Sequence, residues 1–151
     1  MAGFQTKTFS KHDDWMTPQS AWEAISHIIP KDRPIWEPFF GDGTSAGYLC
    51  ELGCPEVIHL DEDFFQSNHG EVIVSNPPFT IKKEVFARLK ELGKPFIMIC
   101  PAPMINTQYM RKLFAEEDDP IQIIIPRRRI QFIKLVDGVI CESESGRCNF
   151  D

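Results

Sequence analysis

The chain has 151 residues, of which 42% are hydrophobic and 25% charged, and its formal net charge is −6. This balance indicates one globular domain and excludes a disordered or fibrous chain. No apolar run approaches the ~20 residues that a membrane span needs, and the first 16 residues form a polar arm unlike a signal peptide. We therefore expect no membrane partner and a cytoplasmic protein, or one in the cytoplasm or nucleus of a host cell. The acidic charge argues against strong nonspecific binding to nucleic acid.

The cysteines are odd in number and scattered, which favours reduced thiols over a disulfide framework. They are Cys50, Cys54, Cys100, Cys141 and Cys148. Neither close pair has a second pair at zinc-finger spacing, so we expect no metal site. Without repeats or linkers, residues 17–151 are expected to form a single domain after the arm 1–16.

The first half of the chain alternates helix and strand signals. Thr17 is expected to cap a helix over 17–30, with Pro18 at its first position and an apolar stripe along one face. A strand over 35–40 runs into the turn 41–43. The helix expected next, over 44–53, ends on Gly53.

The second half continues the alternation. We expect strands over 57–61, 72–75 and 95–101, a loop over 62–70, helices over 81–93 and 107–117, and two final strand-like runs over 121–126 and 130–136. The apolar runs are continuous, as in strands that are buried on both faces. The sequence therefore predicts an α/β fold with a doubly wound, mostly parallel sheet and helices on both faces.

Ligands of such folds bind at the carboxyl ends of the strands. Gly41 and Gly43 allow a ligand to approach the backbone closely, and Glu37 offers a carboxylate that suits an ammonium group, unless it is a capping or ion-paired acid. Asp61 stands where ribose hydroxyls are usually held. Asp63 and Phe64 could offer a hydrogen bond and an aromatic face to a purine, or Phe64 could be packed in the core.

The stretch "SNPPF", Ser75 to Phe79, ends the predicted strand 72–75. Two consecutive prolines lack backbone donors and have fixed φ, so they continue neither a strand nor a helix. Such a rigid turn suits a place where a carbonyl and the Asn76 amide must keep a fixed pose.

In their order and spacing, "EPFFGDG", the strand-end Asp61 and "NPPF" resemble S-adenosylmethionine-dependent amino-methyltransferases, above all the N6-adenine type. Asn76 to Phe79 satisfies every position of the family's Asp/Asn/Ser-Pro-Pro-aromatic pattern. The segment 13–18, "DDWMTP", resembles the family's additional cofactor-contacting motif, and 126–132, "PRRRIQF", resembles its late motif near the target pocket. The resemblance covers residues 13–132.

This resemblance implies a class I, Rossmann-like methyltransferase that transfers a methyl group from S-adenosylmethionine to the N6 amino group of adenine, in DNA ahead of RNA. It implies that Asn76 and the Pro77 carbonyl accept hydrogen bonds from the amino group, which frees the nitrogen lone pair, while Phe79 stacks on the base. The implied catalytic residues are Asn76, Pro77, Pro78 and Phe79. The implied cofactor residues are Trp15, Thr17, Pro18, Glu37, Pro38, Phe39, Gly41, Gly43, Asp61, Asp63, Phe64 and Asn76. The implied substrate residues are Phe79, Arg127, Arg128 and Arg129.

Few segments of the sequence could recognise a target, and we expect no separate target-recognition domain. Only 32 residues separate Gly43 from Asn76, and the chain ends at Asp151, where the family continues into a last antiparallel strand. We therefore expect a shortened sequence, a sheet lacking that strand, or a homodimer or partner subunit that supplies recognition. Arg127 to Arg129 could instead line a charged sheet edge. Other open readings are N4-cytosine methylation, protein-glutamine methylation, and a catalytically silent cofactor-binding subunit.

Overall fold

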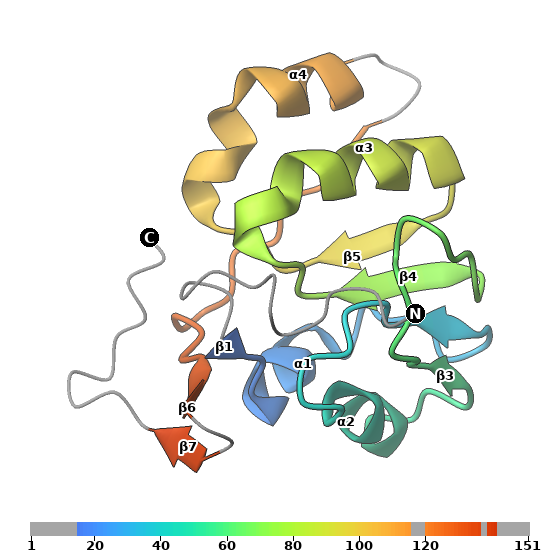
Figure 1. Ribbon diagram of the computed structural model, residues 1–151, viewed down its shortest axis with the longest axis vertical. Helices are drawn as coiled ribbons and strands as arrows, with labels where there is room; N and C mark the ends of the chain where they lie inside the picture. Colours follow the sequence, from blue (N-terminus) through green and yellow to red (C-terminus); the bar gives the residue numbers. More distant parts are fainter. Residues whose placement is uncertain (1–14, 116–119, 137–138, 142–151) are drawn as a thin grey trace.

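The computed structural model describes residues 15–115, 120–136 and 139–141. Its main sheet has four strands in the order β3 (Val57–Ile58), β2 (Ile35–Trp36), β4 (Val72–Ser75) and β5 (Phe96–Met98). Every neighbouring pair is parallel (Figure 1). The predicted parallel sheet is confirmed.

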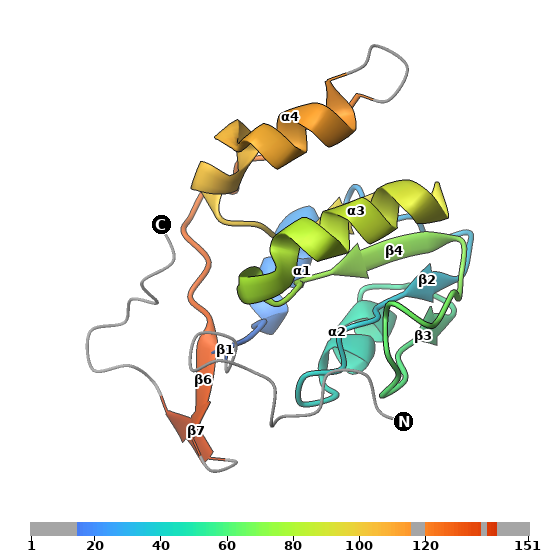
Figure 2. The same cartoon turned by 45° about the horizontal axis from the view of Figure 1, so that its top comes forward.

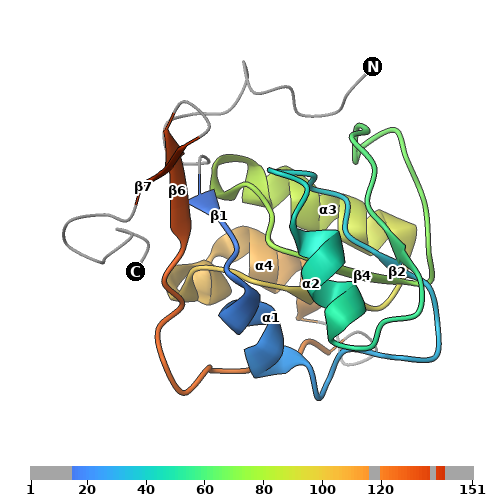
Figure 3. The ribbon, with the colours of Figure 1, turned by 90° about the horizontal axis from the view of Figure 1, so that it is seen from below.

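Helices cover both faces of this sheet. Helices α1 (Gln19–Ile25) and α2 (Ser45–Glu51) lie on one face, in front of the sheet in Figure 3. Helices α3 (Lys82–Leu92) and α4 (Gln108–Phe114) lie on the other face. The expected α/β architecture with two helical layers is therefore present.

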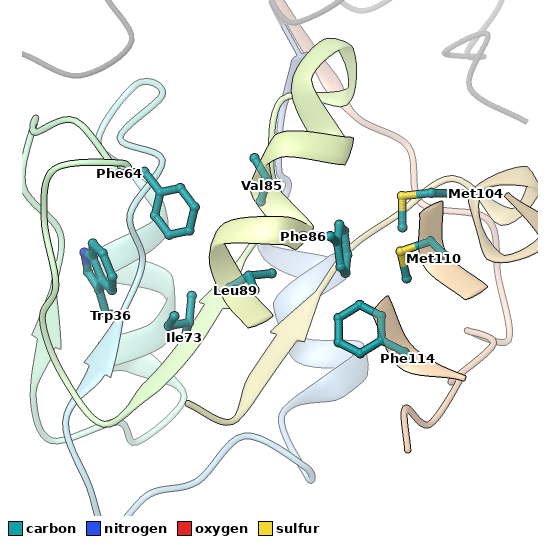
Figure 4. Packing of buried hydrophobic residues seen from close by; sticks show 9 residues of the cluster. All are labelled: Trp36, Phe64, Ile73, Val85, Phe86, Leu89, Met104, Met110 and Phe114. Carbon is teal, nitrogen blue, oxygen red and sulfur yellow. The ribbon is translucent and has the colours of Figure 1, made fainter. Parts of the chain in front are cut away.

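Strand β4 explains why its apolar run is continuous. Val72 and Val74 pack into a core cluster with Trp22 of α1 and Leu49 of α2. Ile73, which points to the opposite face, packs into a second cluster with residues of α3 and α4 (Figure 4). Because successive side chains of a strand point to opposite faces, a central strand needs apolar residues at every position.

The predicted helix 81–93 corresponds closely to α3. It follows a single 3-10 turn, η1 (Phe79–Ile81), and buries Val85, Phe86 and Leu89 against the sheet. It ends at Gly93, whose φ of 64° is left-handed and whose amide bonds the Leu89 carbonyl. Glycine adopts this conformation without the steric cost that other residues meet.

Several elements are shorter than predicted. Strand β2 covers only two residues of the expected 35–40, because Pro38 has no amide to donate to a neighbouring strand. Helix α1 starts at Gln19 with Pro18 as its N-cap residue, and no side chain caps it. The prediction that Thr17 caps this helix is therefore wrong. Helix α4 begins within one residue of the predicted start, and a second 3-10 segment, η2 (Ala102–Asn106), precedes it. Residues 116–117 of its predicted range lie outside the described residues.

A second, antiparallel sheet joins the two ends of the described chain. It has the order β1 (Trp15–Met16), β6 (Ile133–Val136), β7 (Val139–Cys141), set apart from the main sheet in Figure 2. Residues 15 and 16 are thus a strand and not part of the arm, and the run 130–136 forms a strand outside the main sheet.

The run 121–126 forms no strand, contrary to prediction. Its isoleucines favour strands, but strand propensity depends strongly on context and needs a partner to be realised. The arm 1–14 and the tail 142–151 lie outside the described residues. Among the residues that are described, no helix is long and apolar enough to cross a membrane.

Candidate active site

The strand order brings two of the predicted site residues to neighbouring strand ends. From β2 the chain passes through α2 to β3 on one side, whereas β4 pairs with the other side of β2. The carboxyl ends of β2 and β4 therefore form the topological switch point, where ligands of open α/β sheets bind. Glu37 follows β2 and Asn76 follows β4, so these two predicted residues are brought together.

Glu37 joins the two strand ends. Its side chain is buried, with 2% exposure, and its Oε1 accepts hydrogen bonds from the Ser75 hydroxyl and, at 3.0 Å, from the Phe39 amide. Burial raises the pKa of Glu37 to about 8, although both hydrogen bonds lower it. The carboxyl is therefore mostly protonated at neutral pH. Desolvation makes the charged form of Glu37 costly here, and its expected role towards an ammonium group stays a prediction.

The Asn76 side chain is held by a residue near the start of the described chain. Its Nδ2 donates to the Thr17 hydroxyl at 2.9 Å, and Thr17 is itself buried. Its Oδ1 is buried and accepts no hydrogen bond from any described residue. A buried acceptor without a partner costs free energy, so this atom is a candidate position for a ligand or an ordered water.

The prolines after Asn76 are buried, and the turn continues directly into η1. The Pro78 carbonyl accepts from the Ile81 amide at 3.3 Å, and the Phe79 carbonyl accepts from Lys82 Nζ at 3.1 Å. These bonds fix the turn to the start of α3. The half-buried Phe79 ring contacts Phe132 edge-on, with ring centroids 6.3 Å apart.

The glycine turn packs against β1. Gly41 and Gly43 have left-handed φ values of 58° and 81°. A Cβ on Gly41 would lie 3.1 Å from Met16 Sδ, and one on Gly43 would lie 3.1 Å from the Phe40 ring. A residue with a Cβ would be strained at both positions by the left-handed φ and by these close neighbours. The buried Pro38 and the half-buried Phe39 precede this turn and fix its approach to the sheet.

The residues after β3 divide between surface and core. Asp61 is exposed, and Asp63 Oδ1 accepts from the Phe65 amide at 2.9 Å. Phe64 is 1% exposed and packs against Trp36 and Phe39. Phe64 therefore belongs to the core, and the expectation that it presents a face to a purine is corrected.

The sequence patterns did not reveal two residues of the site, Ser75 and His59. His59 follows β3, and its Nδ1 lies 2.8 Å from the Glu37 carbonyl oxygen. A carbonyl oxygen can only accept, so Nδ1 donates. The buried Nε2 has no partner among the described residues, and the ring stacks on Phe40 at 4.9 Å. A polar residue inside the apolar run "VIHL" was the signal that could have revealed His59.

Residues of the N-terminal motif pair in the second sheet with β6, the strand that directly follows the late motif. Trp15 pairs with Lys134, whose ammonium group lies 5.6 Å from the centre of the Trp15 ring. Residues 13 and 14 of the motif lie outside the described residues. Arg127, Arg128 and Arg129 are exposed on an irregular segment, so they do not line a sheet edge.

Comparison of the chain with protein-family models, with curated proteins and with solved structures finds no match. Neither a family nor an activity is therefore shown by likeness. What the site can do follows from its chemistry and from the sequence motifs.

Proposed function

We propose that this chain is an S-adenosylmethionine-dependent methyltransferase acting on the N6 amino group of adenine in nucleic acid, with DNA favoured over RNA. The observation that carries the proposal is the buried Oδ1 of Asn76, an acceptor without a partner among the described residues. It stands at the switch point of a parallel α/β sheet and opens an Asn-Pro-Pro-Phe turn.

Some residues around the switch point suit the binding of S-adenosylmethionine. The close packing of the glycine turn on Met16 supports a shared cofactor role for segments 15–18 and 41–43. Asp61 is exposed and can accept hydrogen bonds from ribose hydroxyls. Glu37 supports the site indirectly, since its hydrogen bond to Ser75 holds the ends of β2 and β4 together.

When bound, S-adenosylmethionine supplies an electrophilic methyl group on a sulfonium sulfur. The chain's part is to prepare the acceptor nitrogen. Asn76 Oδ1 and the Pro77 carbonyl accept its two N–H groups, which turns the lone pair away from the ring. Phe79 offers a face or edge to the base. The methylated nitrogen carries one proton too many and releases it to water, so no strong base is needed.

Thr17 is a positioning residue in this scheme. Its hydroxyl accepts from Asn76 Nδ2, which leaves Oδ1 as the atom available to a substrate. Without that bond the amide could rotate and present a donor to the amino group, which would repel it. The N-terminal motif thus supports the catalytic turn through a contact between residues 59 positions apart.

The decisive experiment measures Asn76→Ala. We expect methyl transfer to unmethylated DNA and RNA to fall about a hundredfold or more, as when one preorganised hydrogen bond is removed from a catalytic site. Calorimetry should show S-adenosylmethionine binding retained. Asn68→Ala, at an exposed asparagine of the loop 62–70, is the matched control and should retain full activity.

Near wild-type transfer by Asn76→Ala would contradict the mechanism. Cofactor binding by the wild-type chain without transfer to any nucleic acid would instead favour a silent subunit. Labelled glutamine in a protein substrate would favour the protein methyltransferase reading.

A further inference from the structure

The Asn76–Phe79 turn has few backbone donors of its own. Pro77 and Pro78 carry no amide hydrogen, so two of its four residues donate no backbone hydrogen bond. The Pro78 carbonyl accepts from the Ile81 amide within the 3-10 turn that follows. The pose of the turn therefore depends in part on side chains that reach it from other positions.

Thr17 and Lys82 bond the two ends of this turn. Thr17 accepts from Asn76 Nδ2 at 2.9 Å, and Lys82 Nζ donates to the Phe79 carbonyl at 3.1 Å. Thr17 precedes α1, whereas Lys82 is the first residue of α3. Figure 1 shows the chain leaving β4 and entering α3 beside the end of β5. Lys82 is half-buried there, although lysine side chains are mostly exposed.

A lysine at the first position of α3 opposes the helix dipole. The amino end of a helix carries a partial positive charge, which favours acidic residues and disfavours cations. Ile81, the N-cap residue, makes no side-chain hydrogen bond that would cap the helix. The helix itself therefore gives no reason for a half-buried cation at this position.

Ion pairing does not explain the position of Lys82. No carboxylate of the described residues lies within ion-pair distance of its ammonium group. Cys100, which follows β5, is close enough for the ammonium charge to favour its thiolate, but burial outweighs this effect and raises the pKa of Cys100 to about 12. The thiol is therefore neutral at neutral pH. This leaves the Phe79 carbonyl as the acceptor that the described chain offers to Lys82.

We infer that Lys82 is a positioning residue that sets the direction of the Phe79 ring. The inference rests on the proposed function, in which this ring receives the target base. A hydrogen bond to the Phe79 carbonyl restricts the ψ angle of Phe79, and the backbone dihedrals limit which side-chain rotamers a residue can adopt. Lys82 thus fixes the stacking partner of the base, while Thr17 fixes the acceptor of its amino group.

The two positioning residues should differ in their kinetic effects. Stacking on Phe79 holds the base equally in the ground state and in the transition state, so its loss should appear in KM. Lys82→Met, which keeps the length of the side chain but cannot donate, should raise the KM for nucleic acid about tenfold and leave kcat within about twofold. Thr17→Val should instead lower kcat, because Asn76 acts on the transition state.

Two further variants complete the kinetic test. Lys82→Arg retains a donor and should restore KM to within about threefold of the wild-type value. Lys83→Met, at the exposed neighbouring lysine, is the matched control and should change neither KM nor kcat.

A second readout does not require methyl transfer. The Phe79 and Phe132 rings meet edge-on, with centroids 6.3 Å apart, so the magnetic resonance signal of each ring depends on the direction of the other. In protein labelled with fluorophenylalanine, the two signals are assigned with Phe79→Leu and Phe132→Leu. Lys82→Met should shift both signals, whereas Lys83→Met should shift neither.

The salt dependence of nucleic-acid binding separates positioning from direct contact. A lysine that binds a phosphate contributes about one contact to the dependence of log Kd on log salt. Lys82→Met should keep the wild-type dependence, because its ammonium group acts on the protein backbone. A dependence reduced by about one contact, with unchanged fluorine signals, would show that Lys82 binds phosphate and would overturn the inference.

The outcomes separate the inference from the proposed function. Wild-type KM and fluorine signals in Lys82→Met, or a reduced kcat with unchanged KM, overturn the inference and leave the function. Shifted fluorine signals in a chain that transfers no methyl group to any nucleic acid overturn the function and support the positioning of Phe79 by Lys82.

Discussion

Glu37 and Asn76 show how two polar side chains at neighbouring strand ends take different roles. Glu37 is satisfied by Ser75 and the Phe39 amide, so its contribution is to hold β2 and β4 in register. Asn76 is satisfied only at Nδ2, so its Oδ1 is available to a ligand. The difference arises from local donors, because each side chain has an oxygen that can accept hydrogen bonds.

Glu37 should make stability depend on pH. Its ordinary pKa of 4.5 is raised to about 8 in the folded chain. Between these values the folded chain holds a proton that the unfolded chain has released. The contribution of Glu37 is therefore complete below pH 4.5, declines by at most about 1.4 kcal/mol per pH unit as the pH rises towards 8, and is lost above it.

Glu37→Gln, which resembles the protonated side chain, should remove this slope. We expect urea denaturation between about pH 5 and 8 to show a flatter free energy of unfolding, with the variant more stable than the wild type at the alkaline end. Glu56→Gln, at an exposed glutamate, is the control and should retain the wild-type slope. If the free energy of unfolding depended on pH equally in the wild type and in Glu37→Gln, a buried proton on Glu37 would be contradicted.

At the scale of elements, two helix glycines differ in backbone conformation: one lies inside a helix and the other ends one. Gly93 ends α3 in a left-handed conformation, and a Cβ there would meet no atom within 4 Å. Gly47 lies inside α2, and a Cβ there would also meet nothing within 4 Å. Since space is open at both sites, any difference between their alanine variants reports backbone conformation alone.

Gly93→Ala should destabilise the protein by about 1–2 kcal/mol, the cost of a left-handed backbone for a residue with Cβ. Gly47→Ala should stabilise it by roughly 0.5–1 kcal/mol, because alanine is the better helix former and restricts the unfolded chain. Thermal or urea denaturation measures both. The same sign of change at the two positions would show that packing, not backbone conformation, decides the effect.

At the scale of the whole molecule, the two sheets differ in how they are supported. Strand β4 is buried on both faces between helical layers. Single residues in and beside the β1-β6-β7 sheet contact the site, such as Thr17 with Asn76, Phe132 with Phe79 and Met16 with the glycine turn. Local opening should therefore reach the smaller sheet first.

Amide hydrogen exchange followed by mass spectrometry tests this order. Peptides over 72–75 should exchange slowest, at rates that approach global unfolding, whereas peptides over 133–136 should exchange faster. Under the proposed function, added S-adenosylmethionine should slow exchange at 15–18 more than at 96–98. Equal protection of 72–75 and 133–136 without ligand would show that the two sheets open as one unit.

The alternation of apolar runs with amphipathic ones was enough to predict the α/β class, the parallel sheet and helix α3, because these patterns report local periodicity and burial on one or two faces. The motifs likewise indicated the switch point, with Asn76 and the glycine turn at adjoining strand ends. The sequence alone failed where a partner far along the chain decides the outcome. Thr17 bonds Asn76 instead of capping a helix, and the strand 133–136 pairs with β1 outside the main sheet.

Only the tertiary structure decided which polar groups are satisfied. The protonation of Glu37 depends on its complete burial beside Ser75, and the exposure of Ile123 to Ile125 depends on the absence of strand pairing in that described segment. Residue type sets what a side chain can do, but desolvation and hydrogen-bond partners come from elements distant in sequence. For that reason the motifs indicated the strand ends of the candidate site, and the fold decided which of its polar atoms have hydrogen-bond partners among the described residues.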